Sequence, residues 1–271
     1  PMEMEQLGLI LPRKEGNGYY DRFRERVMFP IRNERGQVVA FGGRIIDNNI
    51  SNQKYMNSPD TPLFNKGRLL YGLDVAKSSI REKDQAIIVE GYMDVIACHQ
   101  YGVTNVVAPL GTAFTPEQAK LLMRNTYQIC VSFDGDTAGS KATWRSLDIL
   151  AELGAQVKVI TLPDGSDPDE FLKKNGSEAF QTEISKSQEL IVYKIGRLME
   201  NTNTDEIAGK MQIVKAMLGD IMKMNSPVAR ESAVNIISQK LQLTENAIYS
   251  ELKNYNRSSN FEEREKNVSP N

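Results

Sequence analysis

Several acidic residues in the middle of the chain come directly after short apolar runs. Glu90 follows one run, and Asp134 and Asp136 follow another. The stretch after a further run carries three more aspartates, Asp164, Asp167 and Asp169. Carboxylates two residues apart on an extended chain point the same way, and a glycine such as Gly135 lets the backbone turn between them. Carboxylates that meet at one place repel one another unless a cation neutralises them, so this pattern predicts a metal site.

The side-chain inventory indicates which metal to expect. The chain has one histidine, His99, and two separated cysteines, Cys98 and Cys130. Tetrahedral zinc sites are built from histidine and cysteine, so no zinc is expected here. Carboxylate oxygens favour Mg²⁺ or Mn²⁺, and two such ions about 3.5–4 Å apart can clamp the attacking and leaving oxygens of phosphoryl transfer. We therefore expect two or more hard divalent ions and a phosphoryl-transfer reaction.

Some of these carboxylates also have simple structural explanations. Asp167 precedes Pro168 and Glu170, which is the pattern of a helix N-cap with its capping-box partner. Asp164 lies in a Pro-Asp-Gly turn, and Asp94 fits a charge on the solvent side of a helix. Asp167 can serve as cap and as ligand at once, so both interpretations stay open for it.

Strands and helices alternate from residue 85 onward, and this alternation positions the carboxylates. The predicted strands are 86–89, 106–108, 129–133 and 157–162. The predicted helices are 93–101, one that opens with a capping box at Thr115, and 142–153, closed by Gly154. Alternation with short links predicts a parallel sheet covered on both faces. Ligands of such sheets bind at the carboxyl ends of the strands, which is where the acidic residues fall.

The same patterns divide the chain into four parts. Residues 1–84 predict a mixed α+β amino-terminal subdomain with a hairpin around the turn 33–36, and residues 85–185 carry the central parallel sheet. Residues 186–256 show only helical periodicity and predict a helical bundle. The polar residues 257–271 predict a disordered tail. The expected fold class is therefore α/β.

Charge is distributed unevenly although the net charge is only −2. Residues 12–68 hold 11 lysines and arginines against 6 acidic residues, whereas residues 86–184 hold 7 against 13. A basic segment followed by an acidic segment is expected in an enzyme that binds a polyanion and also binds a divalent metal. No apolar run has membrane-spanning length and the cysteines lie apart, so we expect a cytoplasmic protein without a membrane partner.

Three acidic motifs together resemble the Toprim domain, which DNA primases share with topoisomerases and some nucleases. They are Val89-Glu90-Gly91, Phe133-Asp134-Gly135-Asp136 and Asp167-Pro168-Asp169. The longer stretches 90–94 and 133–139 closely resemble sequence motifs of bacterial replicative DNA primases. Four upstream stretches resemble the amino-terminal subdomain of the same enzymes, namely 20–31, 41–44, 54–59 and 63–68. The resemblance covers nearly the whole chain and makes the central sheet a Toprim sheet.

The resemblance implies roles for particular residues. It makes Glu90, Asp134 and Asp136 the catalytic metal ligands, with Asp94, Asp167 and Asp169 around them. Glu90 is alternatively a general base on the primer 3′-hydroxyl. For nucleotide and template it implies Arg44, Lys54, Tyr55, Asn57, Lys66 and Arg24. Cations beside aromatic rings suit a groove for single-stranded nucleic acid, although Arg22, Arg24 and Arg26 also fit the solvent side of a strand.

The resemblance also implies a function. It predicts template-directed synthesis of short RNA primers on single-stranded DNA from nucleoside triphosphates. A replicative helicase and a zinc-binding domain are expected to act through regions outside this chain, and a guanosine alarmone is expected to inhibit at the same site. Two rival functions stay open. One is metal-dependent DNA cleavage of the topoisomerase kind, and the other is DNA binding without catalysis.

Overall fold

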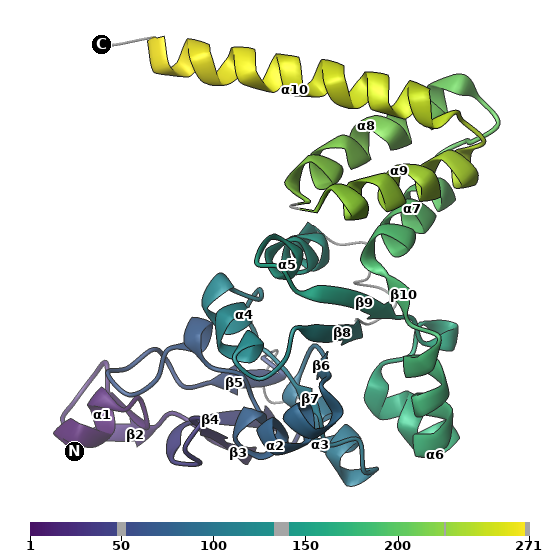
Figure 1. Cartoon of the computed structure of the whole chain (residues 1–271). Coiled ribbons are helices and arrows are strands. Elements are labelled where there is room, and N and C mark those ends of the chain that lie inside the picture. The colour runs from purple at the N-terminus through teal and green to yellow at the C-terminus, as the bar shows by residue number, and fades with distance from the viewer. Residues whose placement is uncertain (48–52, 133–140, 225, 269–271) are drawn as a thin grey trace. The chain divides into compact units, whose positions relative to one another are not determined.

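The computed structural model describes residues 1–47, 53–132, 141–224 and 226–268, and Figure 1 shows their elements. The chain divides into two compact units, Pro1–Ser187 and Gln188–Asn271. The first unit spans the positions of all predicted site residues, and its two larger sheets position those that the structure describes.

Short antiparallel strands build the amino-terminal part of the first unit. The helix α1 (Met2–Gln6) precedes the paired strands β1 (Ile10–Pro12) and β2 (Tyr19–Asp21). A three-stranded sheet follows in the order β3 (Arg26–Arg32), β4 (Val38–Ile45) and β5 (Tyr55–Asn57). Asn33 closes the β3–β4 turn, because its Oδ1 accepts hydrogen bonds from the backbone N–H of Arg35 (3.0 Å) and Gln37 (3.1 Å). The predicted hairpin is confirmed.

A parallel sheet forms the other half of the first unit. Its strands run in the order β9 (Gln156–Ile160), β8 (Gln128–Ser132), β6 (Ala86–Ile88) and β7 (Val106–Val107). They alternate along the chain with α2 (Leu73–Lys83), α3 (Tyr92–Gln100), α4 (Pro116–Met123), α5 (Lys141–Glu152) and α6 (Pro168–Ser185). Two short 3₁₀ turns complete the unit, η1 (Lys66–Arg68) and η2 (Pro163–Gly165). Every residue of β6 is buried, as in a strand covered on both faces, and the α/β class is confirmed.

Local signals fix where α4 begins. The backbone N–H of Gln118 donates to Thr115 Oγ1 (3.1 Å), and the backbone N–H of Thr115 donates to Gln118 Oε1 (3.0 Å). This is the capping box that the sequence predicts. The buried Gln118 side chain also donates from Nε2 to the backbone oxygens of Lys66 (2.9 Å) and Leu69 (2.8 Å). The start of α4 therefore holds the segment that carries Lys66.

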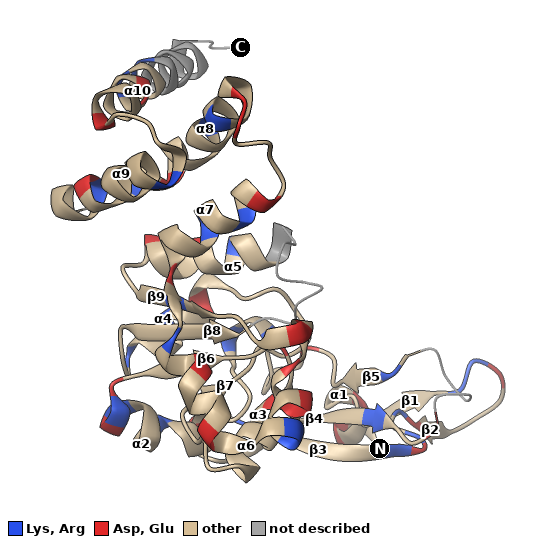
Figure 2. Cartoon of the chain, turned by 90° about the vertical axis from the view of Figure 1, so that its right-hand side faces the viewer, with Lys and Arg blue, Asp and Glu red and all other residues tan. Residues whose placement is uncertain are grey.

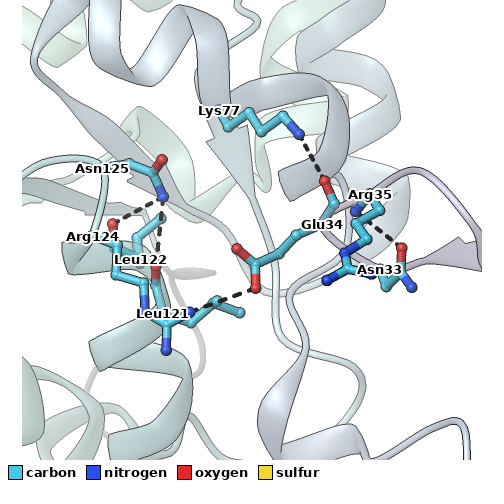
Figure 3. Close-up of polar contacts among 8 residues, drawn as sticks. All are labelled: Asn33, Glu34, Arg35, Lys77, Leu121, Leu122, Arg124 and Asn125. Carbon is cyan, nitrogen blue, oxygen red and sulfur yellow. Dashed lines mark hydrogen bonds and ion pairs between the residues drawn. The ribbon is translucent and has the colours of Figure 1, made fainter.

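Polar contacts fasten the β3–β4 hairpin to helices of the parallel sheet, as Figure 3 shows. Lys77 on α2 donates from Nζ to the backbone oxygen of Glu34 in the hairpin turn (2.7 Å). Arg124, directly after α4, lies 3.8 Å from the Glu34 carboxylate. A small apolar cluster adds to these contacts and consists of Ile31, Ala40, Phe64 and Leu110. The antiparallel sheet is thereby fixed to the part of the unit that carries the parallel sheet.

The second unit is a bundle of helices. The short strand β10 (Gln188–Glu189) precedes α7 (Leu190–Glu200), α8 (Ile207–Lys223), α9 (Pro227–Leu241) and α10 (Glu245–Val268). Each helix contributes a fully buried apolar side chain to one core, among them Ile195, Ile213, Ile237 and Ile248. Lys194 is buried beside the core and lies 2.7 Å from the Asp220 carboxylate. The predicted helical bundle is confirmed.

The last part of the chain differs from the prediction of a disordered tail. α10 continues through Arg257 to Val268. The segment 257–268 contains no proline or glycine and is rich in glutamate, arginine and lysine, which favour helix. Polar composition alone does not separate a disordered segment from a polar helix. Within the described ranges, no helix combines the length and apolar character needed to cross a membrane.

Candidate active site

The parallel strands bring their carboxyl ends to one edge of the sheet. Ile88, the last residue of β6, lies beside Val131 of β8. Two residues further on, Glu90 is half-buried. Asp134 and Asp136 follow β8 in the sequence but lie outside the described residues. The register therefore places Glu90 next to the strand from which the two aspartates continue.

Asp94 is buried, with only 9% of its surface exposed. It lies in the first turn of α3, and its Oδ2 accepts a hydrogen bond from the backbone N–H of Gly91 (3.1 Å). A carboxylate here satisfies an amide that the helix leaves unpaired, and the helix dipole favours its charge. The interpretation of Asp94 as a solvent-facing helix charge is therefore wrong. Because Gly91 follows Glu90 directly, this bond holds Asp94 close to Glu90.

Asp167 and Asp169 both have local partners at the start of α6. Asp167 is the N-cap, and its Oδ1 accepts from the backbone N–H of Glu170 (2.7 Å). Asp169 lies 2.7 Å from the ammonium of Lys173, and this hydrogen bond raises the pKa of Lys173. The capping interpretation of Asp167 is confirmed, whereas a metal role for either aspartate stays a prediction.

The buried thiol of Cys98 lies within electrostatic range of two of the carboxylates. Burial raises the pKa of Cys98 to about 12, with further contributions from the negative charges of Asp94 and Asp169. Asp94 belongs to α3 and Asp169 to α6, and these two helices pack against each other. The fold thus places two predicted ligands that are distant in sequence on helices that pack against each other. Within the described part of the chain, no three acidic, histidine or cysteine side chains form a group that could hold a metal ion.

One face of the β3–β5 sheet forms the second part of the site. Cross-strand pairing places Val27, Arg44 and Tyr55 in one row, and Phe29, Gly42 and Asn57 in the next. The guanidinium carbon of Arg44 lies 5.8 Å from the centre of the Tyr55 ring, and 40% of the surface of Tyr55 is exposed. Figure 2 shows Arg segments on β3 and β4. An exposed ring beside a cation suits a stacked nucleobase with a phosphate nearby.

The other predicted binding residues lie on neighbouring segments. Lys54 is exposed and directly precedes Tyr55. Lys66 is half-buried at the start of η1. Arg24 is exposed, and its guanidinium carbon lies 5.2 Å from the centre of the Tyr20 ring. Arg44, Tyr55 and Asn57 therefore share one sheet, whereas Arg24 and Lys66 come from outside it.

Arg26 has a structural role. Its guanidinium donates to the backbone oxygens of Gly43 (3.2 Å), Gln53 (2.9 Å) and Lys54 (3.3 Å). These bonds tie the start of β3 to β4 and to the segment before β5. From the sequence, Arg26 was either a cation of the nucleic-acid groove or a charge facing solvent. In the structure its side chain forms hydrogen bonds within the sheet instead.

Tyr92 is a residue of the site that the sequence motifs did not assign. It is the first residue of α3 and is only 5% exposed. Its ring centre lies 5.0 Å from that of Phe29, 5.5 Å from that of Tyr55 and 5.4 Å from that of Tyr71. Tyr92 therefore joins the acidic segment 90–94 to the β3–β5 face. The one signal in the sequence is an aromatic residue between two acidic residues, and its partners are distant along the chain.

Comparison with known proteins identifies the family. Three family models match successive parts of the chain. They are the DNA primase catalytic core, N-terminal domain (residues 1–77), a Toprim-like model (87–172) and the DnaB-helicase binding domain of primase (191–246). A solved DNA primase domain from Pseudomonas aeruginosa has a TM-score of 0.80 at 38% identity, covering 93% of this chain and 79% of that one. The chain belongs to the bacterial DNA primase family.

Two further primases are similar over most of this chain. The DNA primase of Clostridium acetobutylicum is 46% identical over 249 residues, which are 92% of this chain and 41% of that protein. A structure of the DnaG primase catalytic domain bound to ssDNA has a TM-score of 0.76 at 37% identity, covering 89% of this chain and 76% of that one. The chain thus spans about two fifths of the curated primase. The resemblance found in the sequence is confirmed, and neither rival function is favoured.

One expectation about partners needs correction. From the sequence, the helicase-binding region was expected outside this chain, but the helicase-binding family model matches residues 191–246. This range spans α7 from its second residue, α8, α9 and the start of α10. Helical periodicity is common to any small bundle, so it did not separate a partner-binding bundle from a part of the catalytic core.

Proposed function

We propose that this chain carries the RNA-polymerising activity of a DNA primase, which copies single-stranded DNA into short RNA primers in the bacterial cytoplasm. The observation that carries this proposal is the position of Tyr92, which joins the acidic segment 90–94 to the β3–β5 face. The ring of Tyr92 packs on Phe29 and Tyr55 of the β3–β5 face. In the sequence, Tyr92 lies between Glu90 and Asp94. A polymerase needs this combination, because it must hold nucleotide and template beside the groups that activate the α-phosphate.

The donor set fits hard divalent ions. All the predicted ligands offer carboxylate oxygen, and Asp94 and Asp169 lie on α3 and α6, which pack against each other. Glu90, Asp134 and Asp136 are the proposed main ligands, with Asp94, Asp167 and Asp169 supporting them. Bound Mg²⁺ or Mn²⁺ would neutralise the charge that develops as the primer 3′-oxygen attacks the α-phosphate and pyrophosphate leaves. Glu90 acts either as a ligand or as the base for the 3′-hydroxyl.

The β3–β5 face is proposed to bind the nucleotide and the template. The exposed Tyr55 ring stacks on a base, and Arg44 beside it takes phosphate charge. Lys54, Lys66 and Arg24 extend the positive charge along neighbouring segments. Asn57 is oriented by its own bond, since its Nδ2 donates to the backbone oxygen of Leu110 (2.9 Å).

Incorporation of labelled ribonucleotides on single-stranded DNA, with and without Mg²⁺, tests this function. We expect metal-dependent RNA product. Nicked template without RNA would support the cleaving alternative instead. Binding of template without any metal-dependent product would support a non-catalytic module.

The second unit is proposed to bind the replicative helicase. The family model over residues 191–246 supports this, and α8 offers the exposed apolar side chain of Ile207. Ile207→Glu is expected to weaken binding to the helicase hexamer about tenfold, since an exposed apolar contact becomes a charge. Val75→Glu, on an exposed position of α2 in the first unit, is the matched control. Equal affinity of both variants would place the helicase surface elsewhere.

A guanosine alarmone with diphosphates at both ends is proposed to compete for the same site. Metal-bound carboxylates facing Arg44, Lys54 and Lys66 would bind any polyphosphate, whichever sugar carbon bears it. Rising triphosphate concentration should therefore relieve alarmone inhibition of primer synthesis. Inhibition that triphosphate does not relieve would place the alarmone at a separate site.

A further inference from the structure

A glycine on the β3–β5 face allows two polar side chains to approach the strand closely. Gly42 on β4 pairs with Phe29 on one side and with Asn57 on the other. A Cβ atom at Gly42 would lie 3.1 Å from Asn57 Oδ1 and 3.2 Å from the Cε1 and Cζ atoms of Tyr92. The absence of a side chain at Gly42 therefore allows the Asn57 amide and the ring of Tyr92 to pack closely against β4.

Two polar atoms at this place have no protein partner among the described residues. The Tyr92 hydroxyl is buried without a hydrogen bond, and so is Asn57 Oδ1. The other end of the Asn57 amide is used by Leu110, and this bond fixes the direction in which Oδ1 points. Buried polar groups are nearly always hydrogen-bonded in folded proteins, so two such atoms on side chains that both pack against Gly42 point to a ligand that bonds them.

The Tyr92 hydroxyl lies near the arginines of this face. Burial raises the pKa of Tyr92 to about 12, with Tyr55 and Tyr71 adding to the rise, whereas the positive charges of Arg26 and Arg44 lower it. Both arginines are therefore close enough to act on the hydroxyl. The phenol of Tyr92 carries one O–H group, so it can donate a hydrogen bond to a ligand.

We propose that the Tyr92 hydroxyl and Asn57 Oδ1 together bind the ribose 2′-hydroxyl of the incoming nucleotide, and that this pair selects ribonucleotides over deoxyribonucleotides. The proposal rests on the polymerase function proposed above. A hydroxyl accepts and donates at once, and the site offers one donor, the phenol, and one acceptor, the amide oxygen. A phosphate does not fit, because the amide oxygen would face another acceptor.

The position of Tyr92 favours the sugar over the base. Tyr92 is two residues from Glu90, which belongs to the proposed metal site at the α-phosphate. The sugar is the part of a nucleotide next to the α-phosphate, and the base lies further out, where the Tyr55 ring is exposed. A deoxyribonucleotide would leave both buried atoms unbonded, and sites built to bond a hydroxyl reject analogues that lack it.

Extension of an RNA primer annealed to single-stranded DNA measures this selection. The quantity compared is the ratio of kcat/KM for ATP to kcat/KM for dATP in the full chain. Tyr92→Phe keeps the ring contacts and removes the donor, so we expect the ratio to fall about tenfold through slower use of ATP. Tyr71→Phe is the matched control. Tyr71 belongs to the same aromatic cluster. Burial raises its pKa, with Asp74 adding to the rise and Arg32 opposing it, so its hydroxyl has other charged neighbours than that of Tyr92.

The possible outcomes separate this inference from the proposed function. A wild-type chain that incorporates neither nucleotide contradicts the polymerase function itself. An active wild-type chain whose ratio is unchanged in Tyr92→Phe overturns the sugar-binding role alone. If Tyr92→Phe does not fold, 2′-fluoro-ATP with the wild-type chain decides, because fluorine cannot donate to Asn57 Oδ1. We expect 2′-fluoro-ATP to be used less well than ATP, and equal use of ATP, 2′-fluoro-ATP and dATP overturns the proposal.

Discussion

The acidic edge and the β3–β5 face of the first unit hold their polar side chains in different ways. At the acidic edge, Asp94 and Asp167 accept hydrogen bonds from backbone amides at helix starts, and Asp169 pairs with a lysine. On the β3–β5 face, Asn57 Oδ1 and the Tyr92 hydroxyl are buried without a protein partner in the described part of the chain.

The two regions therefore orient their side chains for a ligand in two different ways. Helix starts fix Asp94 and Asp167 through the backbone, and the helix dipole favours their charge before any ion arrives. Tyr92 and Asn57 are instead held in place by packing. Their hydroxyl and amide oxygen stay without a hydrogen bond to any described residue and are available to a ligand. Substitutions at the acidic edge should therefore affect chemistry or stability, whereas substitutions on the face should affect nucleotide affinity and choice.

The largest effect is expected from Asp136→Asn. Loss of one charged ligand should lower incorporation about 100-fold or more, since metal neutralises the charge of the transition state. Template binding should stay intact or become stronger, because a negative charge near phosphate is removed. Asp164→Asn is the control, since Asp164 is exposed in a turn with a φ of +59°, a conformation that asparagine tolerates. Near-normal synthesis by Asp136→Asn would contradict the metal role.

Arg44→Ala should act on nucleotide affinity instead. Removal of a charged hydrogen-bond donor to phosphate is expected to raise the KM for nucleotide about tenfold with a smaller change in kcat. Arg81→Ala removes an exposed arginine of α2 that bonds Asn125 (2.9 Å) and serves as the control. A lowered kcat at unchanged KM would show that Arg44 belongs with the catalytic groups, and the contrast between the two regions would fail.

Periodicity and local signals in the sequence predicted most of the fold. Alternating apolar runs gave the strand and helix order of the parallel sheet, and Thr115 and Gln118 gave the start of α4. These features depend on neighbours within one turn of chain, so a single sequence contains them. The length of α10 was not predictable in this way, because polar composition fits both a helix and a disordered segment.

The site was predictable as a set of residue types but only partly as an arrangement. The acidic motifs identified Glu90 and Asp94, yet the burial of Asp94 depends on how α3 packs. The role of Tyr92 could not be predicted, because Phe29 and Tyr55 meet it only through tertiary contacts. Asp134 and Asp136 remain predictions from sequence and family.

A smaller effect is expected from the lysines around the face. Lys54→Ala or Lys66→Ala should weaken binding of single-stranded DNA and reduce the slope of log affinity against log salt by about one unit for each lost phosphate contact. Lys120→Ala, at an exposed position of α4, should leave the slope unchanged. Unchanged slopes for both Lys54→Ala and Lys66→Ala would mean that template binds along another path.

The smallest effect separates the two roles of Asp167. Asp167→Asn keeps an N-cap acceptor for the Glu170 amide, whereas Asp167→Ala removes it. We expect the alanine variant to lose about 1 kcal/mol of stability, which lowers the Tm of a unit of this size by roughly 2–4 °C. The asparagine variant should unfold like the wild type and yet need more Mg²⁺ for half-maximal synthesis, because it keeps the cap and loses the charge. An unchanged Mg²⁺ requirement in the asparagine variant would reduce Asp167 to a cap and leave the metal to the other carboxylates.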